Sequence, residues 1–337
     1  MPAASHHGAG LAPVDTASYT PPMRILVVMD PPETVLVDAD TSFALMEEAQ
    51  ARGHRVDHCL ATDLFLSGRE VGARVRRATM RREPGAAPIS LHGPEDVLFS
   101  QIDVVLVRKD PPFDSNYLWA TQLLEHARST TLVVNDPRAL RDANEKLYAT
   151  HFPEVMPDTL VTNDKDRIRA FVRAMGGLGV LKPLSGAGGD GVFLLRDEDL
   201  NFNAIVETVT HVGKRLAMAQ RFLPEVRVGD KRILLLDGEP LGAILRVPKS
   251  DDVRSNIHVG GSVARATLDE DDRRIVAALA PRLRQDGLYF VGLDVIGGRL
   301  TEVNVTSPTG IQQMSRLDGK NHSATVLDWI ERRRKSA

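Results

Sequence analysis

Three oxygen-bearing side chains, Asp294, Glu302 and Asn304, lie in GLDVIGGRLTEVNVTSP (292–308), a stretch that otherwise has the composition of buried strand. Two carboxylates buried together repel each other unless a cation joins them. Two carboxylates and an amide oxygen are hard ligands that suit Mg²⁺, with Mn²⁺ as the alternative ion, and substrate phosphates and water would complete the shell. The competing interpretation is a set of polar residues on a solvated sheet face.

The length of the turn between the two strands decides whether the carboxylates meet. A two-residue turn at Gly297 and Gly298 would place Asp294 opposite Thr301 and send Glu302 to the other face. A three-residue turn over 297–299 would pair Asp294 with Glu302 directly, and the period of two would keep Asn304 on the same face. We therefore predict the three-residue turn.

A glycine-rich segment, GAGGDG (186–191), satisfies the dinucleotide-binding pattern G-x-G-x-x-G. That pattern needs a helix to begin at its last glycine, whereas VFLLR (192–196) predicts a second strand. A glycine turn between two strands is instead typical of a flap whose backbone N–H groups approach phosphate oxygens closely. The competing interpretation is a flexible hairpin tip. The candidate phosphate contacts are Ser185, Gly186, Gly188, Gly189 and Gly191.

Two lysines strengthen the phosphate hypothesis. Lys182 lies among apolar neighbours in VLKP just before the flap, and Lys146 lies in NEKLYA. Each alone is typical of a solvated surface lysine. Together with the flap, they indicate a cationic phosphate site.

Composition and charge limit the class of protein. The 337 residues are 42% hydrophobic and 26% charged, and the net charge is only -3, so no overall field favours nucleic acid or a membrane surface. No apolar run approaches the roughly 18 residues of a membrane helix. Residues 1–22 have the composition of a disordered tail and lack the pattern of a secretory signal.

The chain has a single cysteine, Cys59, so an internal disulfide framework is excluded. A lone cysteine fits a reducing compartment, and we expect a cytoplasmic protein. Because Cys59 lies in a short β-like run, a packed strand thiol is a better interpretation than a nucleophile.

The order of elements predicts an α/β domain at 23–145, followed by a small lid at 146–223 and a C-terminal α+β domain at 224–337. In the first domain, strands alternate with helices as in a parallel sheet, and the polar, basic segment 64–96 is expected to form a hairpin followed by a mobile loop. The expected strands are 24–29, 54–60, 103–108, 131–135, 158–162, 178–183, 192–195, 215–223, 231–237, 240–247, 289–296 and 300–305, and the expected helices are 40–53, 115–129, 137–152, 165–177, 199–213, 269–286 and 319–334.

From about Met23 to its end, the chain resembles the bacterial glutathione synthetase family of the ATP-grasp superfamily. The resemblance rests on stretches that occur in the right order: VMDP, RKDPPFD, NEKLYA, LKPLSGAGGDGVF, MAQRFLP and LTEVNVTSPTGI. It implies an ATP-grasp fold, cytoplasmic and homotetrameric, although no repeat or heptad supports the tetramer independently. The tail before Met23 and the detail of 69–95 lie outside the family pattern.

The resemblance also implies a reaction. ATP would phosphorylate the cysteinyl carboxylate of γ-glutamylcysteine, and the amine of glycine would displace phosphate to form glutathione. Two Mg²⁺ ions held by Asp294, Glu302 and Asn304 would bridge the phosphates. The adenine would lie at the hinge strand, Gln220, Arg221, Phe222 and Leu223.

Other residues are assigned to the peptide side of the site by the same resemblance. Arg246 would stabilise transition-state charge with Arg232 as a weaker companion, and a surface salt bridge is the other interpretation of Arg246. The segment 248–261 would close over the acyl phosphate and exclude water. The remaining expected substrate contacts are Asp30, Ser42, Arg108, Arg254, Asn256, Gly260, Gly261 and Ser307.

Two alternatives stay open at this stage. Another ATP-grasp ligase would share the flap, the hinge and the metal trio, and would differ only in substrate-facing segments such as RKDPPFD (108–114). An ATP-binding regulatory protein would keep the fold without turnover, but the presence of all three predicted metal ligands and Arg246 argues against it. The residues alone support only a Mg-ATP enzyme.

Overall fold

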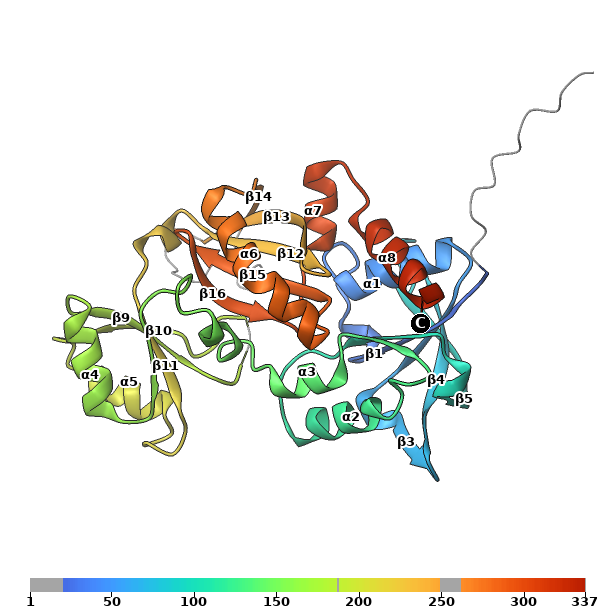
Figure 1. Cartoon of the computed structure of the whole chain (residues 1–337), viewed down its shortest axis with the longest axis horizontal. Coiled ribbons are helices and arrows are strands. Elements are labelled where there is room, and N and C mark those ends of the chain that lie inside the picture. Colours follow the sequence, from blue (N-terminus) through green and yellow to red (C-terminus); the bar gives the residue numbers. More distant parts are fainter. Residues whose placement is uncertain (1–20, 187, 249–261, 337) are drawn as a thin grey trace, which may run out of the picture.

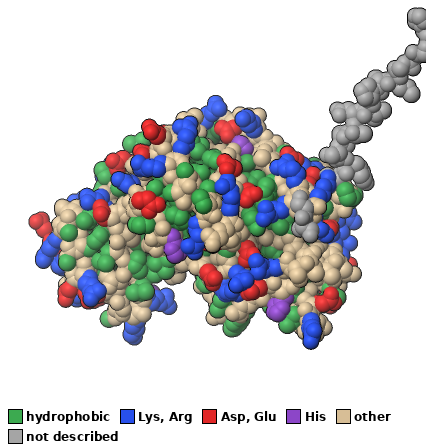
Figure 2. All heavy atoms as spheres, viewed as in Figure 1, with side chains coloured by type: hydrophobic (Ala, Val, Ile, Leu, Met, Phe, Trp, Pro, Cys, Tyr) green, Lys and Arg blue, Asp and Glu red, His purple; other side chains and the backbone are tan. Residues whose placement is uncertain are grey.

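The computed structural model describes residues 21–186, 188–248 and 262–336. It has three sheets, and Figure 1 shows the C-terminal sheet between the N-terminal sheet on one side and the lid on the other. None of the described helices combines the length and the apolar run that a bilayer crossing requires. On the face seen in Figure 2, basic and acidic side chains are interspersed.

The N-terminal sheet has the strand order β3-β4-β2-β1-β6-β7, with β5 paired to β4. Its centre is parallel, as predicted, because β1 pairs in parallel with both β2 and β6. Helix α1 begins where the Asp40 side chain accepts a hydrogen bond from the Phe43 N–H. The elements are β1 (Arg24–Met29), α1 (Thr41–Ala51), β2 (Arg55–Cys59), β3 (Leu64–Ser67), β4 (Glu70–Met80), β5 (Ile89–Leu98), β6 (Val104–Arg108), α2 (Ser115–Glu125), β7 (Leu132–Val134) and α3 (Pro137–Asp142).

The segment predicted as a hairpin and a mobile loop is ordered throughout as an antiparallel ribbon. Strands β3 and β4 form the predicted hairpin, but β5 then pairs along nearly the whole length of β4. The loop prediction was wrong because charged residues face solvent on one side of the ribbon while Val71, Ala73 and Val75 are buried on the other.

The lid is a four-stranded antiparallel sheet of order β10-β9-β11-β8, covered by two helices. Its separate small core contains Ile168, Val172, Leu181, Phe202 and Val206, which pack the helices onto the sheet. The elements are β8 (Thr159–Thr162), α4 (Lys165–Ala174), β9 (Leu178–Pro183), β10 (Phe193–Arg196), α5 (Phe202–Val209) and β11 (Ala217–Arg221).

The C-terminal sheet has the order β14-β13-β12-β15-β16 and is antiparallel throughout. Helix α6 packs against it through residues such as Ile275, Leu279 and Leu283. Strand β14 was missed in the sequence. The elements are β12 (Asp230–Leu236), β13 (Glu239–Val247), β14 (Ser262–Arg265), α6 (Glu270–Asp286), β15 (Phe290–Ile296) and β16 (Arg299–Asn304).

The last two helices, α7 (Ile311–Asp318) and α8 (His322–Ser336), return to the N-terminal sheet. Leu327 and Ile330 of α8 are fully buried in the same apolar cluster as Ile25 of β1 and Phe43 of α1. Arg52, at the end of α1, ties this contact together through ion pairs with acidic residues of α8. The first and last parts of the chain therefore share one core.

One predicted helix is shorter than expected, and one helix was not predicted. The predicted helix 137–152 ends at Asp142, and only a 3-10 turn at Tyr148–His151 follows it. Helix α7 was not predicted. The short 3-10 segments are Pro32–Thr34, Ala61–Asp63, Phe99–Gln101, Tyr148–His151 and Pro224–Arg227.

Candidate functional site

The hairpin of β15 and β16 pairs Asp294 with Glu302, as predicted, but by a different route. The turn has two residues, Gly297 and Gly298, both with positive φ (54° and 70°), as a type I′ hairpin requires. A β-bulge next to Asp294 shifts the register by one residue, so that Thr301 has no opposite partner. The prediction of a three-residue turn was wrong because the sequence does not reveal the bulge.

The bulge is stabilised by the side chain of its extra residue. Thr301 Oγ1 donates a hydrogen bond to the Asp294 carbonyl oxygen at 3.1 Å. The Thr301 carbonyl in turn accepts a hydrogen bond from Lys182 Nζ at 3.2 Å. The lysine before the glycine-rich loop is therefore anchored directly to the strand that carries Glu302.

Glu302 lies between the two predicted lysines. Its Oε1 is 3.5 Å from Lys182 Nζ and 3.7 Å from Lys146 Nζ, and Lys146 also donates to the Gly186 carbonyl at 3.0 Å. Both lysines are buried, which excludes the surface interpretation. Burial acts to raise the pKa of Glu302, but the charges of Lys146 and Lys182 lower it below its ordinary value.

Asp294 is held by the two predicted arginines. The guanidinium of Arg232 binds the Asp294 carboxylate through two nitrogens: Nε is 2.5 Å from Oδ1, and Nη2 is 3.1 Å from Oδ2. Arg246 Nη2 lies 3.0 Å from the same Oδ2. Burial alone would raise the pKa of Asp294, but the charges of Arg232 and Arg246 outweigh it and hold the pKa well below the usual range. Since both arginines are buried, the surface salt-bridge interpretation of Arg246 is excluded.

Sequence reasoning missed a second carboxylate in this arginine cluster. Asp230 opens β12 and lies 2.5 Å from Arg246 Nη2, and burial raises its pKa to about 6. The available signal was its spacing from Arg232, since residues two apart on a strand share a face. Arg246 therefore bridges Asp230 and Asp294.

The donor set suits a hard cation only in part. Among the described residues, no three His, Cys, Asp or Glu side chains gather as a metal site. Asp294 and Glu302 are opposite each other, and Asn304 donates its amide to the Gly292 carbonyl at 3.3 Å, which leaves its amide oxygen for another partner. The arginines already engage both oxygens of Asp294, so a cation there would have to share them.

A cleft of about 140 Å³ lies between the lid and the C-terminal sheet. Lys182 and Glu302 line it together with the predicted hinge residues Gln220, Arg221, Phe222 and Leu223. Gln220 is buried and donates to Thr159 Oγ1 at 3.0 Å, whereas Arg221 points outward to Asp158.

The glycine-rich loop connects two antiparallel strands, β9 and β10, as predicted, and no helix follows it. Gly186, Gly188, Gly189 and Gly191 all have positive φ, which side chains with a Cβ rarely adopt. Gly189 lines the cleft between the lid and the C-terminal sheet. Ser185 is exposed at the start of the loop.

The predicted peptide contacts divide into two groups. Arg108 is buried and donates to Ser42 Oγ at 3.0 Å and to the Pro308 carbonyl at 2.9 Å, next to the half-buried Ser307. Asp30 instead organises the segment after β6, through Lys109 at 2.8 Å and the Asp110 N–H at 2.9 Å. The predicted residues Arg254, Asn256, Gly260 and Gly261 lie outside the described residues.

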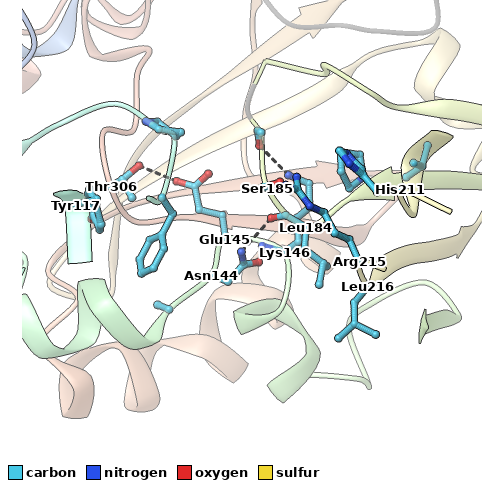
Figure 3. Close-up of a pocket in the computed structure, with 16 residues that line it drawn as sticks. Tyr117, Asn144, Glu145, Lys146, Leu184, Ser185, His211, Arg215, Leu216 and Thr306 are labelled. Carbon is cyan, nitrogen blue, oxygen red and sulfur yellow. Dashed lines mark hydrogen bonds between the residues drawn. The ribbon is translucent and has the colours of Figure 1, made fainter. Parts of the chain in front are cut away.

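A second cavity, which we call the lateral pocket, encloses about 330 Å³ beside Lys146. Its walls come from the segment around Phe113 and Tyr117, the connection 143–146, and the lid residues 183–186 and 209–216 (Figure 3). Glu145, another residue missed in the sequence, faces this pocket, and its Oε1 accepts a hydrogen bond from Thr306 Oγ1 at 2.9 Å. A carboxylate in an irregular connection has no periodicity that could reveal it.

The single cysteine takes no part in either cavity. Cys59 is buried in the N-terminal core, and burial raises the pKa of its thiol far above the ordinary value. The prediction of a packed strand thiol is confirmed.

Two family models match the chain and together cover most of it. The N-terminal domain of prokaryotic glutathione synthetase matches residues 23–141, and the ATP-grasp domain of the same family matches residues 145–319. The chain belongs to the prokaryotic glutathione synthetase family. The family resemblance read from the sequence is therefore confirmed.

Curated relatives agree over nearly their whole length. A glutathione synthetase of Gloeobacter violaceus is 49% identical over 317 residues, which cover 91% of this chain and 96% of the relative. That of Rhodopseudomonas palustris is 46% identical over 312 residues, covering 93% and 99%. That of Yersinia pestis is 43% identical over 314 residues, covering 92% and 98%.

Solved structures support the fold. The D-cycloserine synthetase DcsG superposes with a TM-score of 0.62 at 17% identity, covering 91% of this chain and 99% of its own. A RimK domain ATP-grasp protein from Sphaerobacter thermophilus gives 0.58 at 19% identity, covering 90% and 98%. The ATP-grasp architecture predicted from the sequence is confirmed.

Proposed function

We propose that this chain catalyses the ATP-dependent ligation of γ-glutamylcysteine and glycine to glutathione, ADP and phosphate. The observation that carries the proposal is the arrangement on β15 and β16, where Glu302 is held by two lysines and Asp294, directly opposite, by two arginines. Membership of the glutathione synthetase family supplies the substrate class.

ATP occupies the cleft between the lid and the C-terminal sheet. The hinge strand, Gln220 to Leu223, lies against the adenine, and Lys182 and Lys146 contact the phosphates that the loop 185–191 covers. The burial of both lysines supports this role, because burial lowers the pKa of Lys182 and an incoming phosphate compensates the buried charge.

Asp294, Glu302 and Asn304 hold Mg²⁺, with Mn²⁺ as the alternative ion. The bound cation supplies electrostatic stabilisation of the transferred phosphoryl group. Glu302 is the more available ligand, since its nearest cations are lysines at 3.5 and 3.7 Å, distances at which contact is loose. Asp294 would be the less available ligand, because the arginines already engage both of its oxygens.

A carboxylate is a poor electrophile, so the cysteinyl carboxylate is first phosphorylated to an acyl phosphate. Arg246, fixed between Asp230 and Asp294, faces this carboxylate with Arg232 and stabilises the charge that develops on it. Arg108, Ser42, Asp30 and Ser307 bind the peptide on the N-terminal side. The segment 248–261, with Arg254, Asn256, Gly260 and Gly261, closes over the intermediate and excludes water.

The wider organisation follows the family. We propose a substrate domain at 23–145, a lid at 146–223 and a catalytic domain at 224–337. We also propose a cytoplasmic homotetramer, with no nucleic-acid or membrane partner.

The test is Mg²⁺-dependent phosphate release from ATP by the purified protein, with each substrate added alone and then together, and with the product identified by mass spectrometry. Release that requires both γ-glutamylcysteine and glycine, with glutathione formed, supports the proposal. Glutathione formation that persists after all divalent cations are chelated contradicts the metal assignment. ATP binding without acceptor-dependent release contradicts the ligase.

A further inference from the structure

Strand β16 is an outer strand of the C-terminal sheet and carries both Glu302 and Asn304. The free side of an outer strand presents backbone N–H and C=O groups that no neighbouring strand satisfies. Here a residue outside the sheet binds one of these groups, since the Val303 N–H donates to the Glu145 carbonyl at 2.9 Å. The strand that carries two of the proposed cation ligands is therefore supported by the connection between the N-terminal domain and the lid.

Asn135, which directly follows β7 in the N-terminal domain, extends this support to the end of β16. The last pair of the β15–β16 hairpin is Gly292 with Asn304, and the Asn135 side chain bonds the residues just beyond it. Its amide oxygen accepts from the Phe290 N–H at 2.7 Å, and its amide nitrogen donates to the carbonyls of Phe290 and Val305, both at 2.9 Å. One side chain, only 4% exposed, thus joins the start of β15 to the residue that follows β16.

These three bonds require a carboxamide. A backbone N–H only donates and a backbone carbonyl only accepts, so the side chain at position 135 must offer one acceptor and two donors. A carboxamide has the donor and the acceptor of a peptide group, so Asn135 takes the place of a strand residue opposite Phe290. Aspartate has a similar size, but its carboxylate has no donor and would face two carbonyl oxygens.

Asn304 lies between the two residues that are held in this way. The Val303 N–H is bonded to the Glu145 carbonyl, and the Val305 carbonyl is bonded to Asn135. Asn304 is also the last residue of β16, and strand ends separate more readily than strand centres. The position of Asn304 therefore depends on Asn135 more than the positions of the two carboxylates nearer the turn.

We propose that Asn135 is a positioning residue for the cation site, which keeps the Asn304 amide oxygen directed at the cation by holding Phe290 and Val305. This assignment rests on the proposed ligase function and deepens it. The Asn304 nitrogen donates to the Gly292 carbonyl at 3.3 Å, so the oxygen is the end of the amide that is available to a cation. Partners that orient a metal ligand typically change metal affinity about ten- to a hundredfold when they are replaced.

The first test measures cation binding without turnover. Electron paramagnetic resonance of free Mn²⁺ gives the Kd of Mn²⁺ for the protein mixed with a non-hydrolysable ATP analogue. Asn135→Asp should raise this Kd about tenfold or more, because it removes both donors. The Kd of the analogue, measured without divalent cations, should change by less than about twofold, since Lys182 and the hinge strand are untouched.

Thr131→Val is the matched control. Thr131 lies just before β7 and donates a buried hydrogen bond to the Phe99 carbonyl at 2.8 Å, so its loss also weakens the N-terminal domain but removes no bond to the hairpin. An equal rise in the Mn²⁺ Kd in Thr131→Val and Asn135→Asp, or no rise in Asn135→Asp, would overturn the proposal.

The second test asks whether Asn135 acts through Asn304. Asn304→Ala alone should raise the Mn²⁺ Kd about tenfold, and adding Asn135→Asp should then change it by less than about twofold, because the group that Asn135 positions is gone. A further tenfold rise in the double variant would show that Asn135 acts elsewhere. An unchanged Kd in Asn304→Ala overturns the proposal without any variant of Asn135.

Circular dichroism shows whether the Asn135 variants fold. Asn135→Ser, which is neutral and keeps one hydroxyl donor, replaces Asn135→Asp in the same measurements if the aspartate variant does not fold. Loss of the folded state in both variants, with Thr131→Val folded, would make Asn135 a residue of general stability and overturn its positioning role.

Steady-state kinetics separate this assignment from the ligase proposal. The Mg²⁺ concentration for half-maximal rate should rise about tenfold in Asn135→Asp, and saturating Mg²⁺ should restore most of kcat. An effect confined to the KM for γ-glutamylcysteine would assign Asn135 to the dipeptide and overturn its role at the cation site. If the wild type binds Mn²⁺ but forms no glutathione, the ligase is wrong, and the binding data still decide the role of Asn135. If glutathione is formed and the effects of Asn135→Asp and Asn304→Ala on the Mn²⁺ Kd multiply, the ligase stands and the positioning role is wrong.

Discussion

The lysine side and the arginine side of the β15–β16 hairpin hold their carboxylates in different ways. The Glu302 side chain is 23% exposed, and its Oε1 lies 3.5 Å from Lys182 Nζ and 3.7 Å from Lys146 Nζ. The Asp294 side chain is only 7% exposed, and its Oδ1 lies 2.5 Å from Arg232 Nε. Lysine is a compact charge on a flexible stem, and arginine is a rigid planar donor. The lysine side can exchange partners when substrate arrives, while the arginine side is preorganised.

This difference indicates a division of labour. Phosphates and cations enter and leave in each catalytic cycle, so the groups that meet them must release their resting partners. Charge that develops during acyl transfer is best met by groups that are already fixed, because fixed dipoles need no reorganisation.

Replacement of Glu302 by Gln should have the largest effect. The change removes the carboxylate charge that lies between Lys146 and Lys182, and it should lower kcat about a thousandfold because the cation loses its more available ligand. The fold should be retained, since the amide still accepts from Lys182. Steady-state kinetics and circular dichroism measure the two quantities, and near-normal turnover would sink the metal assignment.

Replacement of Arg246 by Ala tests the arginine side. We expect kcat to fall about a hundredfold with the affinity for ATP little changed, because Arg246 faces the carboxylate rather than the nucleotide. Arg246→Lys is the control, because lysine keeps the positive charge but lacks the planar guanidinium. This variant should recover only part of the kcat that Arg246→Ala loses. If the Ala variant chiefly weakens ATP binding, the two sides are not functionally distinct.

Asp230 provides a pH-dependent test of the arginine side. Its pKa is raised to about 6 from 3.8, so the folded protein retains a proton that the unfolded chain loses. The resulting stabilisation is present below about pH 4 and is lost as the pH rises through about 6. Urea denaturation gives the free energies of unfolding of the wild type and of Asp230→Asn, and the quantity of interest is the first minus the second. Between pH 4 and pH 7 this difference should fall by about 1 to 3 kcal/mol. A difference that is flat or rises would show that the charges of Arg232 and Arg246 outweigh the effect of burial on Asp230.

Cys59 is a control outside both sides and should give the smallest effect. Its buried, protonated thiol should react with a thiol reagent about a hundredfold more slowly in the native than in the unfolded protein, as spectrophotometry can follow. Cys59→Ala should change kcat by less than about twofold, because a packed thiol contributes only to stability. Rapid native labelling with loss of activity would show that the thiol is accessible.

Sequence reasoning recovered the elements whose residues alternate regularly. The opposition of Asp294 and Glu302 was predicted because, of the two turn lengths weighed, only the three-residue turn placed both carboxylates on one face. The two-residue turn was not predicted, since a bulge leaves no mark in the hydrophobic pattern. Strand β5, which pairs along β4, was predicted as part of a mobile loop because the exposed face of this ribbon is rich in charge.

Residues that act through irregular backbone were beyond reach. Glu145 lies in a connection without periodicity, and its carboxylate accepts a hydrogen bond from Thr306, which is 161 residues away in the chain. Asp230 was not singled out from the sequence, because only the pairing of β12 with β13 and β15 brings it to Arg246 and Asp294. Such contacts are properties of the tertiary fold rather than of local sequence.

The return of α8 to the first sheet affects how the protein is made. The apolar cluster that contains Ile25 and Phe43 also contains Val326, Leu327 and Ile330, so the first domain lacks part of its core until the end of the chain is available. Domains synthesised first usually fold first. On the ribosome, however, this N-terminal sheet has to wait for the last helix to leave the exit tunnel before it can complete its packing.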